Sequence, residues 1–131
     1  LLNGSWRSSQ NPSLKCSQTN DYFTVDASSR GNHALDYPVG LITIDEVVLA
    51  GGFAGATNWD YYLCTEQGYW TMSPSYFSTN GYANVFGVNS AGNLGYYGMN
   101  VISAVRPVLN LDASVTISGG DGTSSNPFVV S

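Results

Sequence analysis

The sequence is poor in charged side chains, and one long segment has none. Only 10% of the 131 residues are Asp, Glu, Lys or Arg. The segment from Gln67 to Val105 contains no acidic residue, no basic residue and no histidine. Charged side chains are common on free protein surfaces and depleted at the centres of interfaces. A segment without them is therefore expected either to be buried or to contact a partner.

Basic residues and long apolar runs are also scarce. Four Lys and Arg stand against nine Asp and Glu, which gives a net charge of −5 at pH 7. Binding to nucleic acid or anionic lipid requires clustered Lys and Arg, which this chain lacks. No stretch approaches the ~18 consecutive apolar residues of a transmembrane helix. The sequence thus predicts no nucleic-acid partner and no insertion of this segment into a membrane.

Cysteine is limited to Cys16 and Cys64, and neither belongs to a CxxC or Cys/His motif. A zinc site is therefore not expected. The two cysteines either form a disulfide or remain as two buried thiols, and the sequence leaves both alternatives open. Low lysine content and abundant Tyr, Asn, Ser and Gly suggest an extracellular protein. The chain begins with "LLNGSW" rather than Met, so we expect a domain excised from a longer surface protein, with its anchoring segment upstream.

The chain length predicts a single domain, residues 1–131. The clearest local pattern is a short helix after Thr43. Thr43 precedes Glu46 by the three residues of a capping box, and Gly51-Gly52 supply the left-handed stop. Asp45 and Glu46 then lie in the first turn, where they complement the helix dipole and the cap. We interpret them as capping residues rather than as an acid/base pair.

Most other segments read as strands. β-Branched and aromatic runs separated by Gly, Asn and Ser predict strands over 22–25, 61–64, 69–74, 83–88, 93–97 and 103–111. Asn89 to Asn93 is expected to be a hairpin tip. Residues 115–118 and 128–130 are expected to form a terminal hairpin around Asp121-Gly122, and Leu1, Leu2 and Trp6 to end a helix that begins upstream. The predicted class is α+β, dominated by antiparallel sheet.

Several of these segments together resemble a known family. "YPVGLITIDEVVLAGG", "YWTMSP", "VRPVLNL" and "SGGDGTSSNPFVV" are similar to an uncharacterised bacterial domain at the C-terminal end of prepilin-like and other surface-exposed proteins. At greater distance the order resembles the C-type-lectin-like fold in its formylglycine-generating-enzyme-related branch. There a capped helix ending in Gly-Gly precedes a Trp strand, and an Arg-bearing strand closes the sheet. Thr43–Gly52, Tyr69–Ser73 and Val105–Val108 match these parts, and the resemblance implies a C-type-lectin-like fold.

Proteins of this type include targets of diversity-generating retroelements, in which adenine-directed mutagenesis favours Asn, Tyr, Ser, Asp and Gly between the Trp strand and the closing strand. Residues 75–103 have this composition, although they lack Asp and His. The resemblance implies a possibly hypervariable surface on which the hairpins share one exposed face. The expected ligand-binding residues are Tyr76, Phe77, Asn80, Tyr82, Asn84, Asn89, Asn93, Tyr96, Tyr97 and Asn100.

The residue types in this segment also favour binding on physical grounds. Turns alone account for its Asn and Gly residues, but not for four tyrosines and Phe77. Tyrosine offers a large, rigid contact area, while Ser, Asn and Gly adapt their hydrogen bonds to a partner. We expect Tyr96 and Tyr97 to be contact residues whose removal abolishes binding and leaves the fold intact.

Catalysis is not expected from the remaining candidates. His33 is the only histidine and lies in a polar stretch typical of a solvated loop. The related formylglycine-generating oxidases use a cysteine pair late in the sheet, and neither cysteine here has that position. Arg106 is interpreted as a structural arginine paired with an acid or with loop carbonyls. Trp70 is interpreted as a core residue, because Trp in an alternating strand usually packs inward.

The sequence therefore favours a non-enzymatic, extracellular, adhesin-like ligand-binding module without cofactor or metal. Lectin calcium sites need several converging oxygen ligands, and the loops between Gln67 and Val105 hold no carboxylate. The expected partner is a protein or glycan on another cell or on a phage or host surface. A structural pilin-like subunit or spacer that packs against copies of itself is the first alternative, and a divergent enzyme is the second.

Overall fold

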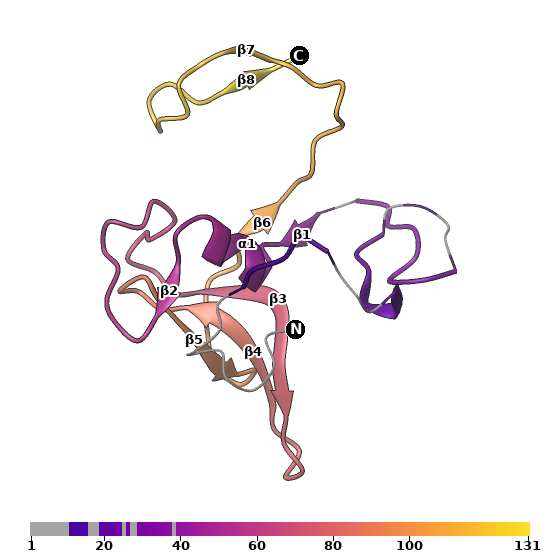
Figure 1. Ribbon diagram of the computed structural model, residues 1–131, viewed down its shortest axis with the longest axis vertical. Helices are drawn as coiled ribbons and strands as arrows, with labels where there is room; N and C mark the ends of the chain where they lie inside the picture. The colour runs from indigo at the N-terminus through magenta and orange to yellow at the C-terminus, as the bar shows by residue number, and fades with distance from the viewer. Residues whose placement is uncertain (1–10, 16–18, 25, 27–28, 38) are drawn as a thin grey trace.

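The structure, a computed structural model, describes residues 11–15, 19–24, 26, 29–37 and 39–131. These residues form an α+β arrangement, with one short α-helix and mostly antiparallel strands (Figure 1). In chain order the elements are the 3-10 turn η1 (Thr19–Asp21), β1 (Gly40–Leu41), α1 (Ile44–Leu49), β2 (Phe53–Ala54), β3 (Tyr69–Phe77), β4 (Ala83–Val88), β5 (Asn93–Gly98), β6 (Pro107–Val108), β7 (Ile117–Gly119) and β8 (Val129–Val130). Within these described residues, no helix has the length and apolarity to cross a bilayer.

The largest sheet has the strand order β2-β5-β4-β3. β3, β4 and β5 form an antiparallel meander, and β2 adds to β5 in parallel. Its two turns are built alike. In each, a left-handed glycine, Gly81 (φ 83°) or Gly92 (φ 72°), donates its backbone amide at 3.0 Å to the carbonyl three residues earlier, that of Ser78 or Asn89. The Asn89 amide donates to the Asn93 carbonyl at 3.0 Å. The hairpin tip predicted at Asn89 to Asn93 is therefore confirmed.

α1 begins and ends as its sequence predicts. The Glu46 amide donates to Thr43 Oγ1 at 3.2 Å, and the Thr43 amide donates to Glu46 Oε2 at 2.8 Å, which completes the capping box. At the other end Gly51 has φ 98°, and its amide donates to the Val48 carbonyl at 3.0 Å. The Gly52 amide donates to the Val47 carbonyl at 2.8 Å. These two bonds form a Schellman motif and satisfy carbonyls that the helix end would otherwise leave unpaired.

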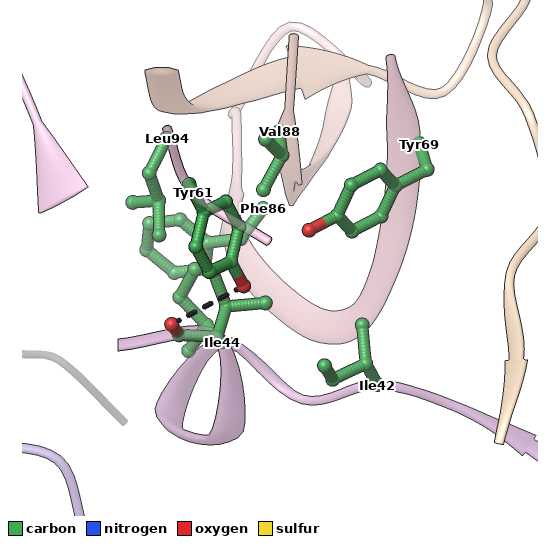
Figure 2. Close-up of a cluster of buried hydrophobic side chains, with 8 residues drawn as sticks. Ile42, Ile44, Tyr61, Tyr69, Phe86, Val88 and Leu94 are labelled. Atoms are coloured by element: carbon green, nitrogen blue, oxygen red, sulfur yellow. Dashed lines mark hydrogen bonds between the residues drawn. The ribbon is translucent and has the colours of Figure 1, made fainter. Parts of the chain in front are cut away.

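The core lies between α1 and one face of this sheet (Figure 2). Ile44 and Val47 of α1 are fully buried against sheet residues, and the Tyr61 hydroxyl donates to the Val47 carbonyl at 3.4 Å. The aromatic residue that β3 contributes to the core is Tyr69, not Trp70. Because neighbouring residues on a strand face opposite sides, Trp70 lies on the other face of the sheet. The assignment of Trp70 to this core was wrong. The other core residues are Ile42, Phe86, Val88 and Leu94.

Three of the predicted strands differ from the structure. Residues 61–64 form turns, in which the Tyr61 amide donates to the Asn58 carbonyl at 3.2 Å and the Cys64 amide to the Tyr61 carbonyl at 2.7 Å. Their aromatic content reflects the burial of Tyr61, and β-propensity of this kind depends on context. Residues 22–24 form a loop, and within 103–111 only β6 is a strand. Leu1 to Trp6, Cys16 and Val25 lie outside the described residues.

The closing segments extend beyond the sheet. β6 pairs with β1, and Ala104 forms a parallel bridge to Tyr69 beside β3. β7 and β8 pair as the predicted terminal hairpin, with Ile117 opposite Val130. In Figure 1 this hairpin stands away from the rest of the domain at the end of an extended connection.

Replacing Thr43 tests whether the capping box stabilises α1. Thr43→Ala removes the acceptor for the Glu46 amide and is expected to lower the free energy of unfolding by about 1 kcal/mol. Thr43→Ser keeps a hydroxyl at the same place and should stay close to the parent. Urea unfolding of both variants measures the difference, and equal midpoints for Thr43→Ala and the parent would refute a stabilising cap.

Candidate binding surface

The register of β4 and β5 decides which side chains of the charge-free segment lie together. Val88 is opposite Leu94, and Phe86 is opposite Tyr96. Since side chains alternate along a strand, these four share the face that packs against α1. Tyr97 follows Tyr96 and is opposite Val85, so it lies on the other face.

The end of this meander beyond the core carries exposed tyrosines. Tyr76 of β3 and Tyr96 of β5 are 51% and 43% exposed. Their rings meet edge to face, with centroids 5.6 Å apart and an interplanar angle of 74°. Edge-to-face contact is a favoured geometry for aromatic pairs and holds both rings in place. The pair therefore presents a preorganised aromatic surface.

Asparagines border the two rings. Asn84 is opposite both Tyr76 and Gly98 in the sheet. A Cβ placed on Gly98 would lie 2.6 Å from Asn100 Oδ1 and 3.8 Å from Asn84 Oδ1. The side-chain amide groups of both asparagines therefore lie next to this glycine. Tyr82 immediately precedes β4, two residues before Asn84, and is exposed. We call Tyr76, Tyr82, Asn84, Tyr96 and Asn100 the distal patch.

Tyr97 does not belong to the distal patch. It packs edge to face on Trp70, with ring centroids 6.3 Å apart. Its side chain lies so close to Gly87 and Gly95 that added Cβ atoms would come within 3.2 Å of the ring and 3.0 Å of the hydroxyl oxygen, respectively. Burial raises the pKa of its phenol. The expectation that the four tyrosines share one face was wrong for Tyr97, because adjacent strand residues point to opposite faces.

Asn89 and Asn93 lie at the opposite end of the meander and shape its turn. Asn89 Oδ1 accepts the amides of Ala91 at 2.9 Å and Asn93 at 3.0 Å. Asn93 Oδ1 accepts the Gly55 amide at 3.0 Å. Their carbonyl groups thus bond to the backbone, as is common for Asn in turns. The structure does not place these two residues with the distal patch, although the sequence grouped them with it.

The last two predicted contact residues, Phe77 and Asn80, are exposed but lie outside the distal patch. Phe77 is opposite Ala83 and points to the same face as Tyr97, where it is exposed. Asn80 occupies the loop between β3 and β4, and its amide donates to Ser78 Oγ at 3.2 Å. Both remain accessible, but only the side chain of Phe77 is assigned to a face by the strand register.

Arg106 has a structural role. Its Nη1 donates to the Leu63 carbonyl at 2.7 Å, and its Nη2 donates to Thr65 Oγ1 at 2.9 Å. The guanidinium lies 4.2 Å from the centroid of the Tyr69 ring, a cation–π contact. Arg106 therefore joins the closing segment to the loop before β3. The interpretation of Arg106 as a structural arginine is confirmed by these contacts.

Acidic and metal-ligating groups are not gathered at the patch. A shallow cavity beside β1 is lined by Phe23, Leu41, Met72 and Val108, together with Glu46, and shares no residue with the distal patch. The Glu46 carboxylate already accepts the amide and the hydroxyl of Thr43, both at 2.8 Å. In the described part of the chain, no three His, Cys, Asp or Glu side chains lie together in a way that would hold a metal ion.

Comparison of the chain with protein-family models, curated proteins and solved structures finds no match.

The two faces of the sheet predict different responses to removal of a tyrosine. Tyr97→Ala exposes Gly87, Gly95 and the edge of Trp70, and should lower the free energy of unfolding by about 2 kcal/mol. Tyr82→Ala removes an exposed ring and should change it by less than about 0.5 kcal/mol. Urea unfolding measures both variants, and equal losses would contradict the assignment of Tyr97 to a packed face.

Proposed function

We propose that this chain is a non-enzymatic, extracellular binding module whose distal patch contacts a macromolecule on another cell or on a phage or host surface. The observation that carries the proposal is the exposed, mutually oriented pair Tyr76–Tyr96 within a segment free of charge. Such rings offer a rigid contact area with little loss of conformational entropy on binding. The domain would serve as the outer part of an adhesin-like surface protein.

The C-type-lectin-like fold is part of this proposal. In its favour, a capped helix ending in Gly-Gly precedes the strand of Trp70, and the segment bearing Arg106 returns beside that strand. The same order motivates the proposal that residues 75–103 vary under a diversity-generating retroelement. The hydrogen bonds refine it, since Asn89 and Asn93 are needed for the turn. Across gene copies, codons for the distal patch should vary while those for Asn89 and Asn93 stay constant.

Loss of one ring of the pair tests the binding surface. Tyr76→Ala is expected to weaken capture of the partner at least tenfold, because buried aromatic anchors carry much of an interface's energy. Tyr37→Ala, which removes an exposed tyrosine from a distant loop, is the matched control and should bind like the parent. The assay is an array of glycans together with a pull-down of surface-labelled bacterial and host cell proteins. Capture that is equal for parent and Tyr76→Ala would place the site elsewhere.

Binding by the distal patch should not depend on metal. Its contacts are aromatic rings and amides, and its segment has no carboxylate to hold a calcium ion. We expect a chelator to leave both partner capture and the melting temperature unchanged. A fall of several degrees in the melting temperature with chelator, restored by calcium, would show that the domain binds calcium and would contradict metal independence.

A structural subunit is the second candidate function, favoured by the terminal hairpin. β7 and β8 form a two-stranded unit that extends from the domain and exposes Ile117, Phe128, Val129 and Val130. An isolated two-stranded hairpin is marginally stable in water, so packing against a second copy would stabilise it. Light scattering of the chain and of a variant lacking residues 112–131 decides between the candidates. A dimer that dissociates on deletion of the hairpin supports the subunit, and a monomer in both cases excludes it.

A further inference from the structure

The loop between β2 and β3 is held from several sides. We call residues 58–65 the aromatic loop. The Asn58 backbone amide donates to the Ala91 carbonyl at 2.8 Å, and Asn58 Nδ2 donates to the Gly51 carbonyl at 3.1 Å. Arg106 holds Leu63 and Thr65 from the other side. Gly92 passes so close to this loop that an added Cβ would clash with the Asn58 carbonyl oxygen. The loop backbone is thereby fixed to the α1 end, the β4–β5 turn and the closing segment.

The fixed loop points two large aromatic side chains into solvent. Two consecutive turns, Asn58–Tyr61 and Tyr61–Cys64, share the buried Tyr61 as their pivot. Trp59 and Asp60 occupy the corner of the first turn, and Tyr62 begins the corner of the second. Trp59 is 60% exposed and Tyr62 is 74% exposed. The Tyr62 ring nevertheless stands edge to face on Tyr61, with centroids 5.7 Å apart at 70°, so its orientation is set by a core residue.

Folding alone does not require these residue types. Turn corners are usually filled by Gly, Asn, Asp or Ser, which suit the backbone at no cost in exposed apolar surface. Trp59 and Tyr62 nevertheless leave more than half of their area exposed. Ordering the loop also costs conformational entropy. A tethered loop that displays two rings with a carboxylate between them has the composition of a contact site.

We infer that the aromatic loop is a second binding site, independent of the distal patch, and that its ligand is a neutral glycan with β-linked, equatorially substituted pyranose rings. Such a ring has one face made of axial C–H bonds, which stacks on an aromatic side chain. The Cα atoms of Trp59 and Tyr62 are three residues apart and so at most about 11 Å from each other. One oligosaccharide of two or more rings can therefore reach both side chains, with Asp60, which lies between them in the sequence, accepting hydrogen bonds from its hydroxyls.

Other ligand classes fit the loop less well. A polyanion would need basic groups, and the guanidinium of Arg106 is already bonded to Leu63 and Thr65. A peptide added as a strand would need unpaired backbone groups, whereas the Asn58 amide and the carbonyls of Asn58, Tyr61 and Leu63 are used within the domain. A sugar that stacks on exposed aromatic rings needs neither basic groups nor unpaired backbone groups.

The test uses cellobiose and N,N′-diacetylchitobiose as probes, with maltose for comparison, in NMR titrations of the whole chain. Saturable shifts at residues 58–65 with either β-linked disaccharide are expected. Trp59→Ala should weaken this binding at least tenfold, and Asp60→Asn and Tyr62→Ala should weaken it severalfold. Trp59→Phe keeps a ring and should retain most of the affinity. The urea midpoint of each variant should match that of the parent, because these side chains are exposed.

Two controls separate this site from the distal patch. Tyr37→Ala removes an 82% exposed tyrosine elsewhere, and Tyr76→Ala breaks the distal pair; both should bind the disaccharide as the parent does. Absence of saturable binding for both β-linked disaccharides overturns the inference. Affinity that is unchanged in Trp59→Ala overturns it equally, as does affinity lost in Tyr76→Ala, which would place the disaccharide at the distal patch. Capture of a macromolecular partner by the distal patch is tested separately, by Tyr76→Ala in the capture assay.

Discussion

The alternation of side chains across the β3–β4–β5 meander is the constraint on which the rest of this structure depends. A strand turns successive residues to opposite faces, and the antiparallel pairing of β3, β4 and β5 carries that rule from strand to strand. One face takes Phe86, Val88 and Leu94 into the core under α1. The same face, continued past the core, becomes the exposed pair Tyr76–Tyr96. Core and candidate site are thus two parts of one surface.

The opposite face is stabilised differently. It has no side chain at Gly87 or at Gly95. The ring of Tyr97 covers both glycines and also packs on Trp70. An aromatic ring laid over cross-strand glycines restores packing that the glycines remove. This explains why two adjacent tyrosines, Tyr96 and Tyr97, have different roles. Tyr96 pairs with Tyr76 on the exposed part of the core face, and Tyr97 packs on Trp70 and the two glycines.

Local chemistry made some features predictable from the sequence. The capping box of Thr43 and Glu46 depends on residues three apart, and the turn at Asn89 to Asn93 on a glycine with positive φ, so both could be read directly. The assignment of faces was not local. Whether Tyr69 or Trp70 enters the core is decided by the pairing of Tyr69 with Val88, across a hairpin whose register includes bulges. Likewise, the aromatic pair Tyr61 and Tyr62 predicted a strand. The structure has two turns there instead, because the segment is held by contacts with Asn58, Val47 and Arg106.

In the proposed function, partners contact the distal patch rather than the charge-free segment as a whole. Covalent labelling of solvent-exposed tyrosines, with and without cells or glycans to which the chain adheres, tests it most directly. Binding is expected to protect Tyr76, Tyr82 and Tyr96 from the reagent while Tyr37 is labelled as before. Protection confined to Tyr37 or to the terminal hairpin, with full labelling of the distal tyrosines in the bound state, would contradict it.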